Sequence, residues 1–157
     1  MRNGPVVVGV DGSPESVLAL ERAVELIESR PADARMGGAS ELVAVHVRAN
    51  GALAYMAPGA GDKICDALDQ VESSARRVTE DAVAGRRIRW DFVVRQGETA
   101  RELTREAEAR HAGVVVVGGH RHSAISSALV RSVDSAMVHT YDGTLMIVRP
   151  EPAPSGS

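Results

Sequence analysis

Apolar residues occur along this chain in two alternating patterns. Short continuous runs, rich in valine, are typical of buried strands. Between them, apolar residues recur every three to four positions, which is the spacing of an amphipathic helix. The strand-like runs lie at residues 6–10, 42–47, 114–117 and 144–148. A further strand is predicted where Ile88, Trp90 and Phe92 alternate with polar residues, and this pattern places Trp90 on the inward side.

Local signals mark the first two helices. Ser13 is placed to cap the first helix, with Pro14 at its first position. Apolar residues at helical spacing extend this helix to about Arg30. The connection at residues 50–62 is rich in glycine and is expected to be flexible. A second helix is predicted to follow it, with apolar positions over residues 68–82.

Two later helices complete the series. Thr99 to Glu102 has the form of a capping box that opens the third helix, and Ser132 is placed to cap the fourth. Because strands and helices alternate strictly, the sequence predicts a doubly wound α/β fold. Its five-stranded parallel sheet is expected to have the flavodoxin-type order 3-2-1-4-5, with helices on both faces. Residues 1–150 form one domain, and the Pro/Ser/Gly-rich residues 151–157 are predicted to be a disordered tail.

Composition narrows the range of partners. The formal net charge of -3 gives no basic surface for nucleic acid. No apolar run approaches the about 20 residues that span a bilayer, and the first residues lack the layout of a signal peptide. Cys65 is the only cysteine, so an internal disulfide is excluded. We therefore expect a cytoplasmic protein with no nucleic-acid or membrane partner.

Histidines and serines gather after the fourth strand. His120 and His122 lie two residues apart, but no third ligand has recognisable spacing, so no metal site is predicted. Ser123, Ser126 and Ser127 are candidates for phosphorylation or for contacting a phosphate. The simpler interpretation of these three hydroxyl groups is the ordinary polarity of a loop.

The fold class itself predicts where a ligand binds. In such sheets the site lies beyond the carboxyl ends of the strands, where the winding direction reverses, here between the first and fourth strands. The loops at that point are Asp11 to Ser13 and Gly118 to Arg131. Each has a glycine turn that leads towards a helix N-terminus, which favours an anion. The length of the second loop also points to function. A tight turn alone explains Gly12 equally well, but it explains Gly118 and Gly119 less well.

The residues at these strand ends resemble those of a known family. The segments concerned are residues 7–13, 46–47, 97–98, 116–120 and 132–133. Together they resemble the universal stress protein family from Val6 to Pro150. The resemblance implies the doubly wound fold and a homodimer formed through the last strand, Thr144 to Val148. The apolar edge of that strand gives a physical reason for pairing.

The resemblance also implies a nucleotide site. ATP-binding members of the family carry Gly-x2-Gly-x9-Gly-Ser/Thr after the fourth strand and an aspartate at the end of the first. This motif maps onto Gly118, Arg121, Arg131 and Ser132, so two of its glycines are arginines. The arginine side chains block the approach of a phosphate to the backbone, but guanidinium groups can themselves pair with phosphate. The implied ligand-binding residues are Gly9, Asp11, Val47, Val117, Gly118, Arg121, Arg131, Ser132 and Val133.

Two functions are compatible with this altered motif. The first is a non-catalytic stress-response regulator that acts as a dimer on protein partners, with weak or absent ATP binding. The alternative is a sensor that binds ATP, AMP or cyclic AMP through an arginine-modified loop. The sequence contains no nucleophile elbow, zinc-protease motif or Walker lysine, so no enzyme is expected. Slow nucleotide hydrolysis is a weaker third hypothesis.

Overall fold

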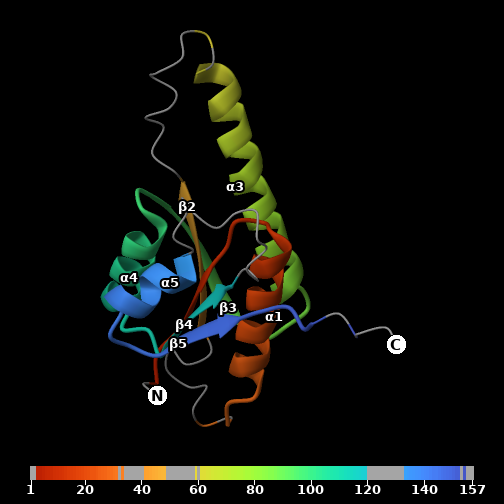
Figure 1. Ribbon diagram of the computed structural model, residues 1–157. Helices are drawn as coiled ribbons and strands as arrows, with labels where there is room; N and C mark the ends of the chain where they lie inside the picture. Colours follow the sequence, from red (N-terminus) through yellow and green to blue (C-terminus); the bar gives the residue numbers. More distant parts are fainter. Residues whose placement is uncertain are drawn as a thin grey trace.

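The computed structural model describes residues 3–31, 33, 41–48, 59, 61–119, 133–152 and 154. Strands and helices alternate within this part of the chain (Figure 1). The elements are β1 (Val6–Gly9), α1 (Pro14–Glu28), β2 (Glu41–Arg48), α3 (Gly61–Val83), β3 (Arg89–Gln96), α4 (Thr99–Ala109), β4 (Val114–Gly118), α5 (Val133–Thr140) and β5 (Leu145–Val148). The strands form one parallel sheet in the order β3-β2-β1-β4-β5. The predicted fold class and strand order are therefore confirmed.

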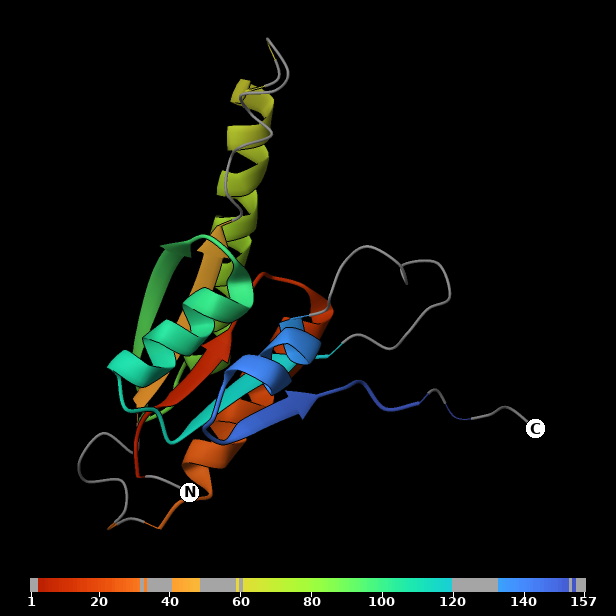
Figure 2. The ribbon, with the colours of Figure 1, turned by 60° about the vertical axis from the view of Figure 1, so that its left-hand side comes forward.

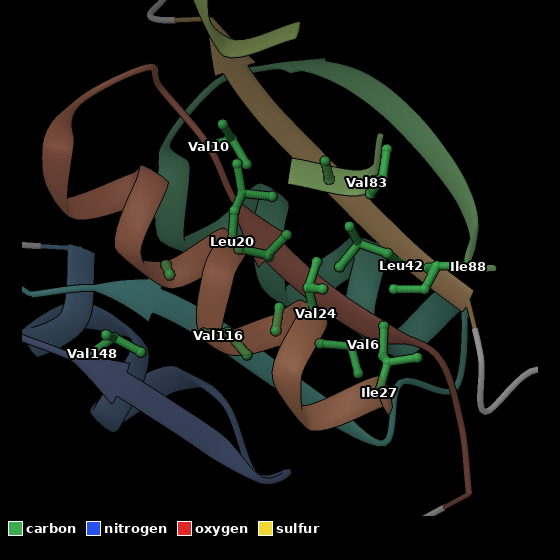
Figure 3. Close-up of a cluster of buried hydrophobic side chains, with 14 of the residues drawn as sticks. Val6, Val10, Leu20, Val24, Ile27, Leu42, Val83, Ile88, Val116 and Val148 are labelled. Carbon is green, nitrogen blue, oxygen red and sulfur yellow. The ribbon is translucent and has the colours of Figure 1, made fainter. Parts of the chain in front are cut away.

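Successive strand residues point to opposite faces of the sheet. Because both faces carry apolar side chains, both are covered by helices. Val6 and Val8 face α1 and α3, whereas Val7 faces α4 and α5. Figure 2 shows α4 and α5 together on one face, with α1 and α3 on the other. Figure 3 shows Leu20 and Val24 of α1 packed over the central strands. Valine and leucine thus build both halves of the core, as the low aromatic content requires.

Helix α1 begins as the sequence predicts. Ser13 is its N-cap, in an extended conformation, and its side chain accepts a hydrogen bond from the Ser16 N–H at 3.3 Å. Pro14 is the first helical residue, where the missing N–H removes no helical hydrogen bond. The N–H of Ser13 in turn donates to Asp11 Oδ1 at 2.9 Å. The turn between β1 and α1 is therefore fixed by its own side chains.

Three local predictions differ from the structure. The N-cap of α4 is Glu98, which makes no side-chain capping bond, so Thr99 is the first helical residue rather than the cap. Helix α3 begins at Gly61, inside the segment expected to be a flexible connection. Trp90 pairs in register with Leu42, but β3 is the edge strand of the sheet and Trp90 remains 38% exposed. Its predicted place in the core is therefore wrong.

Charged side chains join the edge strand β3 to helix α4. Glu106 is only 4% exposed, and its Oε2 accepts hydrogen bonds from Arg95 Nε and Nη2 at 2.9 and 2.6 Å. Its Oε1 accepts a third from Arg110 Nε at 3.0 Å. Hydrogen bonding to Asp91, followed by that to Glu106, raises the pKa of Arg110. Because every oxygen of the buried carboxylate has a donor, burial of Glu106 is compatible with its charge.

No helix in the described part of the chain has the length and apolar character needed to cross a membrane.

Candidate functional site

A pocket of about 270 Å³ lies where β1, β2 and β4 end. These are neighbouring strands in the order β2-β1-β4, so the pocket occupies the point at which the winding of the sheet reverses. Helices α1, α3, α4 and α5 contribute the remaining wall. The lining residues are Gly9, Val10, Asp11, Ser13, Ser16, Val45, His46, Val47, Arg48, Leu68, Val71, Thr99, Leu103, Val117, Gly118 and Val133.

The structure brings together several of the residues implied by the family resemblance. Those that line the pocket are Gly9, Asp11, Val47, Val117, Gly118 and Val133. Arg121, Arg131 and Ser132 lie outside the described residues, as do the histidines and serines singled out between residues 120 and 127. The common location of the first group follows from the topology, since parallel strands end at the same edge of a sheet. Their part in ligand binding stays a prediction.

The turn after β1 requires a glycine for two reasons. Gly12 has a φ of +81°, in the region that disfavours residues with a side chain. A Cβ atom at Gly12 would also lie 2.5 Å from Ser74 Oγ. The turn therefore packs directly against α3. Asp11, just before it, is exposed at the rim of the pocket.

Gly118 has a packing role that is independent of any ligand. A Cβ atom at this position would lie 2.5 Å from the carbonyl oxygen of Glu15, in the first turn of α1. At Gly119 the corresponding contact is 2.8 Å, to Ile147 Cγ2. These glycines allow the end of β4 to approach both α1 and β5. Glycine at the first position of the motif is thus explained by helix–sheet packing alone.

His46 is a buried polar residue of the lining. It is 3% exposed, and its Nδ1 lies 2.8 Å from the carbonyl oxygen of Val10. A carbonyl oxygen can only accept, so we assign a proton to Nδ1 as the donor. The hydrogen bond fixes the ring between β1 and β2. In the described part of the chain, no group of three or more His, Cys, Asp or Glu side chains is placed to hold a metal ion.

Sequence reasoning missed part of the wall. Leu68 and Val71 come from α3, and Thr99 and Leu103 come from α4. Leu68 and Val71 share the apolar period of their helix, and that period predicts only which face is apolar, without showing which turns line a pocket. Leu103 reaches the pocket beside Gly9, where an added Cβ atom would lie 3.1 Å from Leu103 Cδ1.

Arg48 is the only lysine or arginine in the described lining of the pocket. Its Nη1 donates to Asp69 Oδ1 at 2.8 Å and to Glu72 Oε2 at 2.6 Å, both on α3. The hydrogen bond to Glu72, followed by that to Asp69, raises the pKa of Arg48. Arg48 is thus already neutralised by two carboxylates of the protein.

The described lining combines one carboxylate with apolar side chains and hydroxyl groups. Asp11 is its only carboxylate, so it offers no second carboxylate for proton transfer. Most of the other side chains are apolar or are hydroxyl groups near the start of α1. Fold and pocket together define a doubly wound α/β protein with a small pocket at its switch point.

A family model places the chain more narrowly. The model of the universal stress protein family matches residues 3–149. The chain therefore belongs to the universal stress protein family, and the resemblance seen in its strand-end motifs is confirmed.

Individual relatives agree with this assignment. A universal stress protein of Mycolicibacterium smegmatis is 29% identical over 151 residues, which cover 93% of this chain and 46% of that protein. The chain thus spans about half the length of this curated relative. Universal stress protein UspA from Lactobacillus plantarum has a TM-score of 0.70 at 19% identity, covering 95% of this chain and 99% of its own. A universal stress protein in complex with cAMP has a TM-score of 0.60 at 21% identity, covering 93% and 96%. At these identities the two structures show a shared fold.

Proposed function

We propose that this domain is a non-catalytic stress-response regulator whose pocket holds the nucleoside part of an adenine nucleotide. The observation that carries the proposal is the pocket at the ends of β1, β2 and β4, which joins the apolar side chains of Val47, Val117 and Val133 to the carboxylate of Asp11. Apolar walls suit a planar base, and a carboxylate at the rim can accept hydrogen bonds from ribose hydroxyl groups. The relative described as a complex with cAMP supports this choice of ligand class.

The size of the pocket favours a small ligand over a whole triphosphate. Its volume of about 270 Å³ lies just below the about 300–1,000 Å³ that is usual for small-molecule sites. Within the described lining, Arg48 is the only arginine or lysine, and it is paired with Asp69 and Glu72. Recognition of a phosphate therefore rests on the segment after β4, where Arg121 and Arg131 replace motif glycines. We expect AMP and cyclic AMP to bind better than ATP.

Calorimetric titration tests this function. Adenosine, AMP, cyclic AMP and ATP are titrated at one salt concentration into protein freed of bound nucleotide. We expect AMP or cyclic AMP to bind at least about tenfold more tightly than ATP, a difference of about 1.4 kcal/mol. We expect Asp11→Asn to weaken adenosine binding. The control variant is Asp142→Asn, which replaces an exposed carboxylate after α5 and is expected to leave adenosine binding unchanged. Absence of heat with all four ligands would overturn the proposal.

Turnover experiments address the non-catalytic part. Prolonged incubation with ATP or AMP is expected to release no phosphate above the rate without protein, because Asp11 is the only carboxylate in the described lining and Nδ1 of His46 is engaged by the carbonyl oxygen of Val10. Turnover that survives further purification and disappears in Asp11→Asn would assign an enzyme activity instead.

We also propose that the domain forms a homodimer through β5. Among the described strands β5 pairs only with β4, and Leu145, Met146 and Ile147 are only partly buried. An apolar strand with an unpaired edge favours association with another strand. Thr144 and Val148 turn their carbonyl groups towards β4, so the backbone groups of Leu145 and Ile147 face the open edge.

This geometry gives a specific test of the dimer. Ile147→Pro removes an N–H that faces the open edge, whereas Ile147→Ala keeps this N–H and shortens the side chain. Analytical ultracentrifugation is expected to show a dimer for the wild type and for Ile147→Ala, and a monomer for Ile147→Pro. A monomeric wild-type protein at micromolar concentration, or a dimer that survives Ile147→Pro, contradicts the proposed interface.

A further inference from the structure

The first half of α3 forms an overhanging wall of the pocket. The helix has 23 residues, and its buried residues, Ala75, Thr79 and Val83, all lie in its second half. Leu68 and Val71 line the pocket from the first half, and Val71 is 41% exposed. Figures 1 and 2 show the start of α3 extending beyond the carboxyl ends of the strands. The core therefore holds only the second half of α3, and the half that lines the pocket has no buried residue.

A small tilt of α3 changes the pocket. Leu68 precedes the buried Ala75 by seven residues, which is about 10 Å along a helix that rises about 1.5 Å per residue. A tilt of about 10° around Ala75 therefore moves Leu68 by about 2 Å. A movement of that size opens or closes an apolar wall. A contact in the first half of α3 is therefore needed to fix the direction of the helix.

Arg48 supplies that fixation. It lies at the end of β2, and its guanidinium reaches two successive turns of α3 through Asp69 and Glu72, at 2.8 and 2.6 Å. The two carboxylates lie on either side of Val71, between Leu68 and the buried Ala75. The side chains of Arg48 and Glu72 are 26% and 29% exposed, so this contact is only partly screened by solvent. It connects the overhanging half of α3 directly to the sheet.

We propose that Arg48, Asp69 and Glu72 form an ionic latch that holds α3 closed over the pocket, with Arg48 as a positioning residue for ligand binding. The latch acts through Leu68 and Val71 and not by contact with a phosphate, because Asp69 and Glu72 both accept from Arg48 Nη1 and offset the charge of Arg48. The nature of the ligand rests on the function proposed above. If loss of the latch lowers the closed fraction to about a tenth, the apparent Kd rises about tenfold.

Two ligands that differ only in charge test this mechanism. Adenosine and AMP are titrated into wild-type protein and into Arg48→Gln. We expect about a tenfold loss of affinity for each ligand, since the wall contacts the part that they share. The matched control is Arg86→Gln, which breaks another arginine–glutamate pair, of 2.7 Å, that joins α1 to the chain just after α3. Arg86→Gln is expected to leave both affinities unchanged.

Salt gives an independent measurement. Because adenosine is uncharged, salt affects its binding mainly through charged groups of the protein. Raising the salt concentration is expected to weaken adenosine binding to the wild type by screening the partly exposed latch, but not to Arg48→Gln. Equal salt dependence of the two proteins contradicts the latch, as does a loss of affinity for AMP without a loss for adenosine. The second result would place Arg48 on the phosphate.

Hydrogen exchange of the ligand-free protein separates the latch from the proposed function. We expect backbone amides at residues 64–72 to exchange faster in Arg48→Gln than in wild-type protein, with residues 75–83 unchanged. The charge-reversed double variant Arg48→Glu with Glu72→Arg is expected to restore protection. Unchanged exchange in Arg48→Gln overturns the latch, whether or not a nucleotide binds. Changed exchange in a protein that binds no adenine ligand supports the latch and overturns the proposed function.

Discussion

Alanine at Gly118 tests whether the fold needs this glycine in the absence of any ligand. A Cβ atom here would lie 2.5 Å from the carbonyl oxygen of Glu15 and 2.7 Å from its carbonyl carbon. These are backbone atoms of the first turn of α1, and they cannot rotate aside as the end of a side chain can. Adding atoms to a packed contact costs about 1–3 kcal/mol, and we expect Gly118→Ala to lie in the upper part of that range, at about 2–3 kcal/mol.

Thermal unfolding without nucleotide is the appropriate assay. For a chain of this size a loss of about 2–3 kcal/mol lowers Tm by roughly 4–12 °C. Gly119→Ala is the matched control, because the three atoms nearest to the added Cβ belong to the side chains of Ile147 and Arg149 and not to the backbone. We expect this variant to cost less than about 1 kcal/mol. A Tm for Gly118→Ala within about 1 °C of wild type, or a loss no larger than that of Gly119→Ala, would refute the steric reasoning.

The result bears on how the glycine motif is interpreted. If Gly118 is required for the packing of α1 on β4, its presence says little about phosphate binding. The positions that then carry information on the ligand are those occupied by Arg121 and Arg131. Variants at these two arginines therefore distinguish the regulator from the nucleotide sensor more sharply than a count of matching motif positions does.

Two further predictions concern the stability of the fold. Glu106→Gln removes the charge that faces Arg95 and Arg110. Breaking a buried ion pair costs about 3–5 kcal/mol, but Arg95 is 45% exposed and can regain water. We therefore expect urea unfolding to show a loss of stability of about 2 kcal/mol. A loss below about 0.5 kcal/mol would contradict a stabilising role of the Glu106 charge. Ser13→Ala removes the side chain that accepts from the Ser16 N–H and is expected to lower the free energy of unfolding by about 1 kcal/mol. Ser13→Asp keeps an acceptor, and its stability is expected to stay within about a few tenths of a kcal/mol of the wild type. Equal losses of stability for the two variants would show that the cap contributes little.

Most of the architecture follows from the pattern of valines. β1 and β4 are apolar throughout because helices cover both faces of the sheet, and this makes them recognisable without any periodicity. The edge strand is different. Ile88, Trp90 and Phe92 alternate correctly, but alternation indicates a face and does not indicate how far the covering helices extend. Ile88 is buried against the end of α3, whereas Trp90 lies at the open edge, which the sequence alone does not distinguish.

The candidate site also contains residues that the sequence indicates and residues that it does not. Gly9, Val47 and Val117 were implied by the family resemblance. They line the pocket because each stands at or next to the carboxyl end of a strand that the topology brings to one edge. The contribution of α3 could not be placed, because Leu68 and Ala75 share one apolar stripe although only the first lines the pocket. The contact of Arg48 with Glu72 depends on the direction of the helix across the sheet, which is a tertiary property.

The proposed function assigns recognition of the two parts of a nucleotide to different regions of this chain. The described pocket offers apolar walls and one carboxylate, and its single arginine is occupied by α3. The arginines that can meet a phosphate follow β4, at Arg121 and Arg131. Because the latch determines how well the wall closes on the base, it affects every ligand that carries the base, whatever its charge. If Arg121 and Arg131 bind the phosphate as proposed, they affect only charged ligands. The ratio of AMP to adenosine affinity then measures their contribution without that of the latch.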